Sequence, residues 1–135
     1  MRVVIDTNCL VAAIPRKSEA YWLYLAFKSE MFAWIISTEI LNEYHEILTD
    51  FYSKNTADIV INILLSAPNV ELVEPYFSYN LITSDPDDNK FANLAISANA
   101  YCLVSNDKHF NIFKKIVFPP LTVLKLEEFK SIIFP

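Results

Sequence analysis

The 135-residue chain contains no glycine. The phosphate-binding P-loop and the dinucleotide-binding G-x-G-x-x-G motif both require glycine, so nucleotide-cofactor sites of these two types are excluded. Turns must also be made without glycine, and we expect Asn, Asp, Ser and Pro to take their positions.

Cysteine, histidine and long apolar runs are scarce as well. Cys9 and Cys102 are the only cysteines and lie in apolar sequence, which favours buried free thiols in a cytoplasmic protein. The two histidines do not supply the spacing that a zinc site needs. No run of about 18 uncharged apolar residues occurs, so we expect no membrane span.

Positive charge is also in deficit, since the formal net charge is -5. This argues against a passive nucleic-acid coat protein, because phosphate binding usually leaves a basic surface. It does not argue against a nuclease, whose acids would be neutralised by metal. The length and the 53% hydrophobic content suit one core, so we expect a single domain over residues 1–135.

Apolar strand-like runs alternate with helical patterns along the chain. The predicted strands are Arg2–Ile5, Phe32–Ile36, Val70–Val73, Tyr101–Val104 and Leu121–Leu124. The predicted helices are Asn8–Ala13, Ser18–Ser29, Ser37–Tyr52, Thr56 to the residue before Pro68, Pro86–Asn99, and a closing helix from Leu126 or Glu127. This alternation predicts an α/β fold, a three-layer α/β/α sandwich around a parallel sheet of four to five strands.

Four carboxylates fall where such a fold would bring them together. Asp6 and Asp107 follow predicted strands, and Glu43 and Asp88 lie in the opening turns of predicted helices. The carboxyl ends of parallel strands meet at one edge, where ligands usually bind. Clustered carboxylates repel one another unless a cation compensates, so a hard divalent metal ion is the expected ligand.

Helix phase ranks the acids of the helix that begins at Ser37. Its apolar stripe is Ile40, Leu41, Tyr44, Ile47, Leu48 and Phe51. At roughly 100° per residue, Glu43 falls at the border of this stripe, whereas Glu39 and Glu46 point toward solvent. Glu43 is therefore the member of this helix that can reach the sheet edge, with a surface glutamate as the equal alternative.

The segment Asp85-Pro86-Asp87-Asp88 has a structural explanation of its own. Asp85 can cap a helix with Pro86 at its first position, and the helix dipole stabilises acidic side chains in the first turn. Asp88 nevertheless shares a face with Phe91 and should point toward the sheet, so it is the better ligand candidate.

Polar and basic side chains accompany the acids. Thr7 and Asn8 follow Asp6, and Ser105 precedes Asp107. The cations near the ends of the acid-bearing segments could face a substrate, although ordinary surface charge is the more frequent role of any one of them. These cations are Arg16, Lys17, Lys90 and Lys108.

The four segments that carry these residues resemble, in order, the motifs of the PIN domain family, in the branch assigned as toxins of toxin–antitoxin systems. They are Val3–Asn8, Ser37–Tyr44, Asp85–Ala95 and Leu103–Asp107. By position, the acidic cluster of the family falls on the same four carboxylates, and its supporting positions fall on Thr7, Asn8 and Ser105. One departure is Asn106, which stands where the family often has a small residue.

The resemblance implies an Mg²⁺- or Mn²⁺-dependent endoribonuclease whose metal is held by the four carboxylates. Asp6 and Asp88 would form the principal metal position, Asp107 a shared or second position, and Glu43 would bind metal or orient water. The implied partners are an RNA substrate and an antitoxin that inserts a residue into the acidic crevice.

Three questions stay open from the sequence. Tyr21, Trp22 and Tyr24 could stack on RNA bases, although a packed helix is favoured, and the apolar surface of this helix also fits a homodimer or antitoxin interface. A receiver-like phospho-signalling domain is one alternative function, with Lys125 in its favour. A catalytically silent interaction domain with a structural metal is the other.

Overall fold

The centre of the molecule is a five-stranded parallel sheet. The computed structural model describes residues 1–76, 88–116 and 119–135. The strands are β1 (Arg2–Ile5), β2 (Ala33–Ile36), β3 (Val70–Leu72), β4 (Cys102–Val104) and β5 (Val123–Leu124). Their order is β3-β2-β1-β4-β5, and every neighbouring pair is parallel. The predicted parallel α/β sheet is thereby confirmed.

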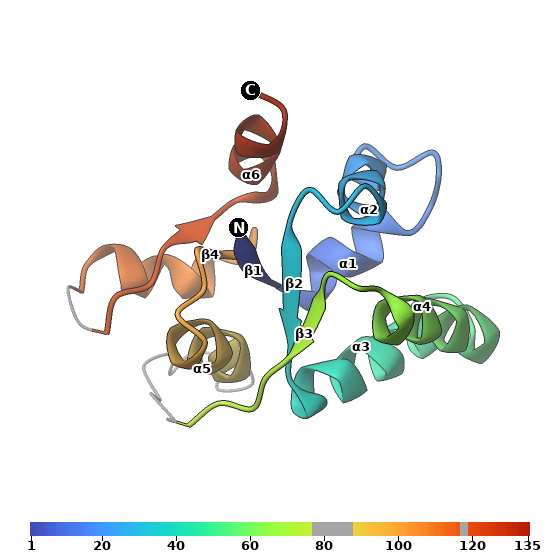
Figure 1. Cartoon of the computed structure of the whole chain (residues 1–135), viewed down its shortest axis with the longest axis horizontal. Helices are drawn as coiled ribbons and strands as arrows, with labels where there is room; N and C mark the ends of the chain where they lie inside the picture. Colours follow the sequence, from blue (N-terminus) through green and yellow to red (C-terminus); the bar gives the residue numbers. More distant parts are fainter. Residues whose placement is uncertain (77–87, 117–118) are drawn as a thin grey trace.

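Helices cover both faces of this sheet (Figure 1). They are α1 (Thr7–Ala13), α2 (Tyr21–Lys28), α3 (Thr38–Phe51), α4 (Lys54–Ser66), α5 (Asn89–Ser97), the 3-10 helix η2 (Lys108–Lys114) and α6 (Leu126–Ile133). Helices α1 to α4 lie on one side, whereas α5 and the orange η2 lie on the other. The three-layer arrangement agrees with the prediction.

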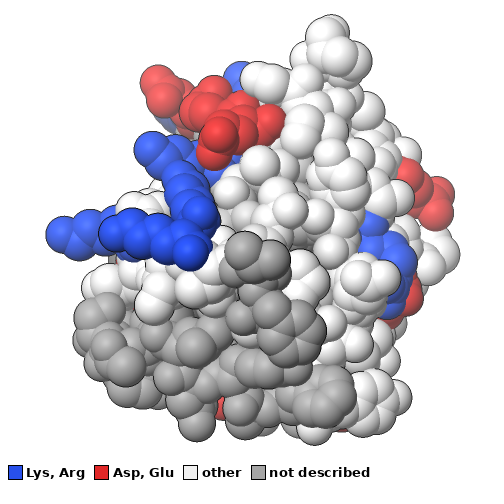
Figure 2. Space-filling view, turned by 90° about the vertical axis from the view of Figure 1, so that its left-hand side faces the viewer, with Lys and Arg blue, Asp and Glu red and all other residues white. Residues whose placement is uncertain are grey.

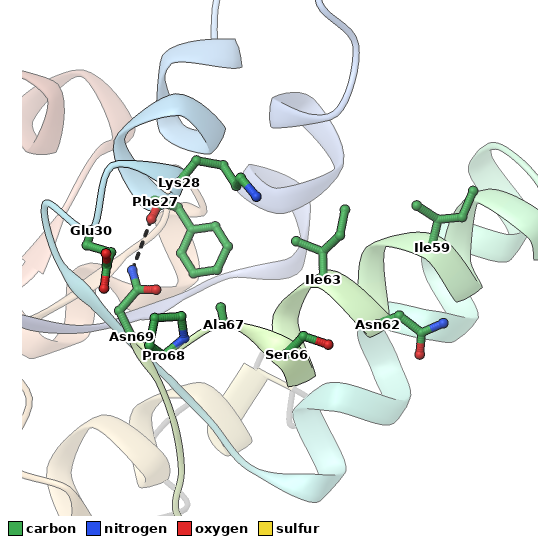
Figure 3. Close-up of a pocket in the computed structure, with 10 residues that line it drawn as sticks. All are labelled: Phe27, Lys28, Glu30, Ile59, Asn62, Ile63, Ser66, Ala67, Pro68 and Asn69. Atoms are coloured by element: carbon green, nitrogen blue, oxygen red, sulfur yellow. Dashed lines mark hydrogen bonds between the residues drawn. The ribbon is translucent and has the colours of Figure 1, made fainter.

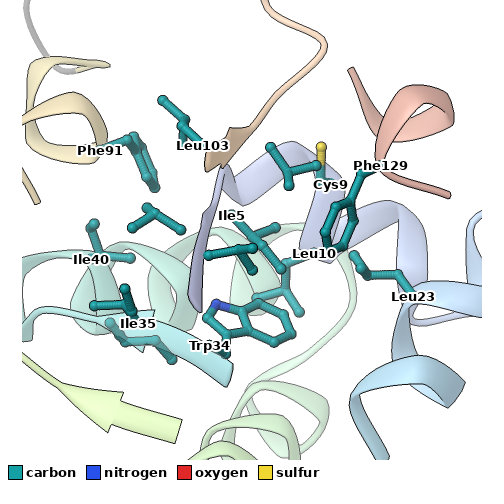
Figure 4. Close-up of a cluster of buried hydrophobic side chains, with 14 of the residues drawn as sticks. Ile5, Cys9, Leu10, Leu23, Trp34, Ile35, Ile40, Phe91, Leu103 and Phe129 are labelled. Carbon is teal, nitrogen blue, oxygen red and sulfur yellow. The ribbon is translucent and has the colours of Figure 1, made fainter. Parts of the chain in front are cut away.

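The core forms on both faces of the central strands (Figure 4). Val3, Val4 and Ile5 of β1 are fully buried, because a central strand of a parallel sheet has helices above and below it. Phe91 of α5 and Trp34 of β2 extend the core, and Phe129 of α6 packs edge-on against Phe32 beside it. Burial of these side chains fixes the positions of the loops at the strand ends.

Several predicted element boundaries are corrected by the structure. Ser18 does not cap a helix, because α2 begins at Tyr21, and α4 begins at Lys54 rather than Thr56. The hydroxyl of Ser53 accepts the Thr56 N–H at 3.0 Å and so starts α4 earlier. Phe51, assigned to the apolar stripe of α3, is 66% exposed and is the last residue of the helix.

Two further expectations concern thiols and membranes. Cys9 and Cys102 are both free and buried, as predicted, and burial raises the pKa of each thiol to about 12. Among the described helices, none is long and apolar enough to cross a bilayer.

The strand order has a consequence for ligand binding. From β1 the chain moves outward through β2 to β3, and then returns to place β4 on the other side of β1. The crossovers therefore reverse direction between β1 and β4, and open parallel sheets bind ligands at such a switch point. A receiver domain has the order 2-1-3-4-5, so this topology rejects the receiver-like alternative.

In the absence of glycine, two residues of the described part of the chain occupy the left-handed backbone region. Glu30 follows α2 with φ 56°, and Asn99 follows α5 with φ 51°. In both cases the next N–H closes the helix end, from Met31 to the Ala26 carbonyl and from Ala100 to the Ala95 carbonyl. Asn was expected in such a position, but glutamate was not, because its side chain lacks the local hydrogen bonding of Asn.

We expect Glu30→Gly to stabilise the protein by about 0.5–1 kcal/mol, since glycine removes the steric cost of a left-handed Cβ. Urea unfolding followed by circular dichroism measures the change. Glu30→Ala is the matched control, because it removes the carboxylate but keeps Cβ. Equal stability of the Gly and Ala variants would show that the backbone conformation of Glu30 carries no cost.

Candidate active site

Asp6 stands at the carboxyl end of β1, directly beside β4. Ile5 is in register with Val104, and the Asp6 N–H donates to the Val104 carbonyl at 3.0 Å. The Ser105 hydroxyl then donates to Asp6 Oδ2 at 2.7 Å. The sheet register therefore places the Asp6 carboxylate and the Ser105 hydroxyl against each other, with Asp6 only 5% exposed.

The surroundings of Asp6 favour its protonated form. Burial is the main cause of its raised pKa, and the nearby carboxylates of Asp107 and Glu43 raise it further. The hydrogen bonds from the Ser105 side chain and the Thr7 backbone act in the opposite direction but do not cancel the burial. A buried carboxylate of this kind gains from a nearby cation.

Asp107 is held by its own loop. Its N–H donates to the Ser105 hydroxyl oxygen at 3.0 Å, and its Oδ1 accepts the His109 N–H at 2.9 Å. The second contact caps η2, so the start of this helix fixes the carboxylate. Ser105 thus lies between the two strand-end acids and contacts both residues.

The structure brings His109 into the same group. Its Nδ1 lies 3.1 Å from Asp88 Oδ2 and 3.2 Å from Asp107 Oδ1. Ligand atoms of these three residues all fall within 4.8 Å of one another, so they could hold a metal ion. The spacing of the two histidines, which excludes a zinc site, did not predict this role for His109. The proximity of His109 to Asp107 in sequence was the available signal.

Asp88 enters the group from α5. It immediately precedes the helix, and its side chain is 13% exposed. The predicted capping residues Asp85 and Pro86, and the neighbouring Asp87, lie outside the described residues. The structure therefore places Asp88 at the site but does not test the start of the helix proposed for this segment.

Glu43 reaches the site from α3, and its half-buried position agrees with the predicted helix phase. Its Oε1 forms an ion pair with Lys90 Nζ at 2.7 Å, and its Oε2 accepts the Thr7 hydroxyl. Glu39 and Glu46 are exposed, as the phase analysis predicted. Three elements therefore converge on this carboxylate: α1, α3 and α5.

Lys90 corrects an expectation. Ordinary surface charge was favoured for it, but its side chain is only 12% exposed and pairs with Glu43. The sequence spacing could not reveal this, because the partner lies on another helix. Lys90 places a fixed positive charge among the acids, where it offsets part of their mutual repulsion.

Some of the remaining predicted residues lie beside the acids, and others lie away from them. Asn8 is exposed and, with Asp6 and Asp107, lines a hollow of about 200 Å³. Lys108 lines an adjoining hollow, described below. Arg16 lines a separate hollow beside Tyr21 and Tyr24, away from the acids, and Lys17 is exposed. Of the four predicted cations, Lys90 and Lys108 are thus the two that adjoin the acids.

A larger hollow, of about 500 Å³, is not at this site (Figure 3). It opens between Phe27 at the end of α2, Ile63 of α4, and Asn69, which precedes β3. Asn69 closes one side by donating to the Phe27 carbonyl at 3.0 Å. This groove lies toward the amino ends of the strands, so its volume gives it no part in the acid chemistry.

Carboxylates thus converge at the switch point of the sheet. In addition, residues 2–109 of the chain match the family model of the PIN domain. The chain belongs to the PIN domain family. PIN domains are generally nucleases, which agrees with a cluster of oxygen ligands in this PIN domain. No protein of curated function matches the chain.

The fold of this PIN domain also occurs in a solved structure. A chain in the crystal structure of VapBC2 from Rickettsia felis, bound to a DNA fragment from their promoter, superposes with a TM-score of 0.65 at 24% sequence identity. The match covers 93% of this chain and 98% of that chain. The two chains therefore share one architecture over nearly their full lengths.

We expect Asp6→Asn to raise the melting temperature of the metal-free PIN domain by a few degrees at pH 7. Because the folded-state pKa of Asp6 is raised, its ionisation costs stability as pH rises from the unfolded value through the folded value. Asn keeps an acceptor for the Ser105 hydroxyl without the charge. The gain should therefore shrink as the pH falls through the unfolded-state pKa of 3.8, because Asp6 then becomes protonated in both states.

Differential scanning calorimetry in EDTA, repeated with Mn²⁺, measures both effects. Mn²⁺ should stabilise the wild type more than the variant, since the variant has lost a charged ligand. Asp58→Asn is the control, because Asp58 pairs with Lys54 and His45 on the surface and its pKa is lowered. A wild type that Mn²⁺ leaves unchanged would count against metal binding at Asp6.

Proposed function

We propose that this PIN domain is a metal-dependent endoribonuclease that hydrolyses RNA phosphodiester bonds. The observation that carries the proposal is the group formed by Asp88, Asp107 and His109, which adjoins the buried Asp6 at the switch point of the sheet. Family membership supports the reaction class. The absence of glycine excludes the P-loop and G-x-G-x-x-G types of nucleotide-cofactor site.

The donor atoms suit a hard divalent ion. Asp6, Glu43, Asp88 and Asp107 would hold Mg²⁺ or Mn²⁺ through carboxylate oxygens, the ligands that these ions prefer. The Nδ1 of His109 adds a nitrogen donor, which favours Mn²⁺ of the two. When bound, the metal would acidify a water molecule and stabilise charge on the phosphate and the leaving oxygen.

Side chains of the protein would also orient the groups that take part in this reaction. Thr7 and Lys90 hold Glu43 from two directions, so its carboxylate is oriented to position a water molecule. Lys90 also supplies a fixed positive charge near the position of the scissile phosphate. Ser105 keeps the acids of β1 and β4 at a constant separation.

The proposed biological role is that of a toxin in a toxin–antitoxin pair in the cytoplasm. The architecture shared with the VapBC2 chain supports it, together with the motifs that the sequence analysis identified. The expected partners are an antitoxin and, through exposed apolar side chains such as Leu25 of α2 and Ile59 of α4, a second copy of the chain. Co-purification of the chain with a protein encoded beside it tests this role.

The nuclease proposal is tested most sharply on α3. We expect Glu43→Gln to lower the rate of RNA cleavage about 100-fold or more in Mn²⁺, because it removes a charged group that binds metal or orients water. Cleavage of a labelled single-stranded RNA, with EDTA as the blank, measures the rate. Wild-type cleavage that persists in EDTA would contradict metal dependence.

Glu46→Gln provides the matched control, since it makes the same chemical change on the exposed side of the same helix. Its rate should stay within about twofold of the wild type, as for surface substitutions that contact no functional group. Equal losses in both variants would assign the effect to α3 as a whole. No cleavage by the wild type with Mn²⁺, despite metal-induced stabilisation, would instead favour the silent domain with a structural metal.

A further inference from the structure

A second hollow adjoins the acids, on the side of β5 and η2. It has a volume of about 110 Å³ and shares Asn106 and Asp107 with the acid-lined hollow. Its other walls include Lys108 and Lys114, at the two ends of η2, and Lys125, which follows β5. The two hollows therefore meet at Asp107, with carboxylates on one side and ammonium groups on the other.

The three lysines are exposed, and no ion pair within the described part of the chain neutralises any of them. Glu128, three residues after Lys125, accepts the Lys125 backbone N–H through its Oε1 at 2.8 Å. Figure 2 shows basic side chains projecting together on this side of the molecule, next to a group of acids. The charge of this group of side chains is therefore positive, whereas the net charge of the chain is -5.

The lining of this lysine hollow suits a phosphate group. Ammonium groups bind phosphate oxygens as point charges, and the exposed amide of Asn111 offers a further donor. The Asn106 side chain is fixed differently, because its Oδ1 accepts the Leu126 N–H at 2.9 Å and so holds the wall between the hollows. The volume corresponds to roughly four water molecules, which a phosphate group could displace.

We propose that the lysine hollow binds the RNA phosphate next to the scissile one, so that the strand crosses Asn106 and Asp107 and continues toward β5 and η2. This inference rests on the proposed nuclease function. Lys90 is engaged with Glu43 inside the acid group, so the lysine hollow supplies the positive charge outside it. Because a contact to a phosphate carries no direct information about the base, the subsite adds affinity without base preference.

The test uses the double variant Lys114→Gln/Lys125→Gln, which leaves Asp107 and its neighbour Lys108 unchanged. In an Asp6→Asn background, binding of a fluorescent single-stranded RNA is measured by anisotropy over a range of salt concentrations. We expect affinity to fall at least tenfold at low salt. The slope of log K against log salt should lose about 0.7, since the hollow binds one phosphate and each phosphate contact on a single strand contributes about 0.7.

Lys28→Gln/Lys54→Gln is the control, because it removes the same charge from α2 and α4, on the other face. It should leave the salt slope within error of the parent protein. In the Mn²⁺ cleavage assay without Asp6→Asn, the Lys114/Lys125 variant should raise KM with kcat nearly unchanged, because a neighbouring phosphate is bound equally in the ground and transition states.

The outcomes separate this inference from the nuclease proposal. If the wild type cleaves RNA and both double variants share one KM and one salt slope, the lysine subsite is wrong and the nuclease function stands. If the wild type cleaves no RNA but RNA binding depends on Lys114 and Lys125, the lysine hollow binds an RNA phosphate, and the nuclease function is wrong together with the place of that phosphate beside a scissile one. Dependence of duplex DNA binding alone on these lysines would overturn the subsite.

Discussion

The structure of the candidate site depends on one hydroxyl group. The Ser105 side chain donates to the Asp6 carboxylate and accepts the N–H of Asp107, so it sets the separation of the two strand-end acids. This is possible only because β1 and β4 pair in a single register, with Ile5 opposite Val104. A shift of one residue would turn the Asp6 side chain to the other face. The pairing of β1 with β4 between helices on both faces therefore also holds the chemistry in place.

Grouping acids at this point has an electrostatic cost, and Lys90 offsets part of it by pairing with Glu43. The His109 ring lies between Asp88 and Asp107. Asp6 has no such cation among its described contacts, and its raised pKa follows from burial together with its acidic neighbours. The negative charge of the site is thus partly compensated at Glu43, on its rim, but not at Asp6, in its centre. A divalent ion would be stabilised most strongly at that centre.

Much of this arrangement could be predicted from local patterns. Continuous apolar runs identified the parallel strands, and strand polarity placed Asp6 and Asp107 at one edge. Helix phase separated Glu43 from the exposed Glu39 and Glu46. These inferences succeeded because each depends on the period of a single element and on a general rule for parallel sheets.

The roles of Lys90 and His109 could not be predicted in the same way. Each follows a site acid by two residues, Asp88 and Asp107 respectively, yet Lys90 pairs across to Glu43 of α3 and His109 reaches back to Asp88 of α5. Their partners are determined by how helices pack on the sheet, which no single period describes. The left-handed Glu30 escaped prediction for a related reason, since the packing at the end of α2 overrides the local preference of glutamate.

The net charge of the chain is a poor guide to how it would meet a nucleic acid, and the site explains why. The acids that dominate the total include those that a metal would neutralise, whereas Lys108, Lys114 and Lys125 stand together immediately beyond them. A phosphodiester approaching this edge would therefore meet repulsion or attraction according to whether the acid group is metal-loaded. The lysines attract the strand in either state, but only the loaded site accepts the neighbouring phosphate. Metal binding and strand binding should accordingly be coupled, because each reduces the electrostatic cost of the other.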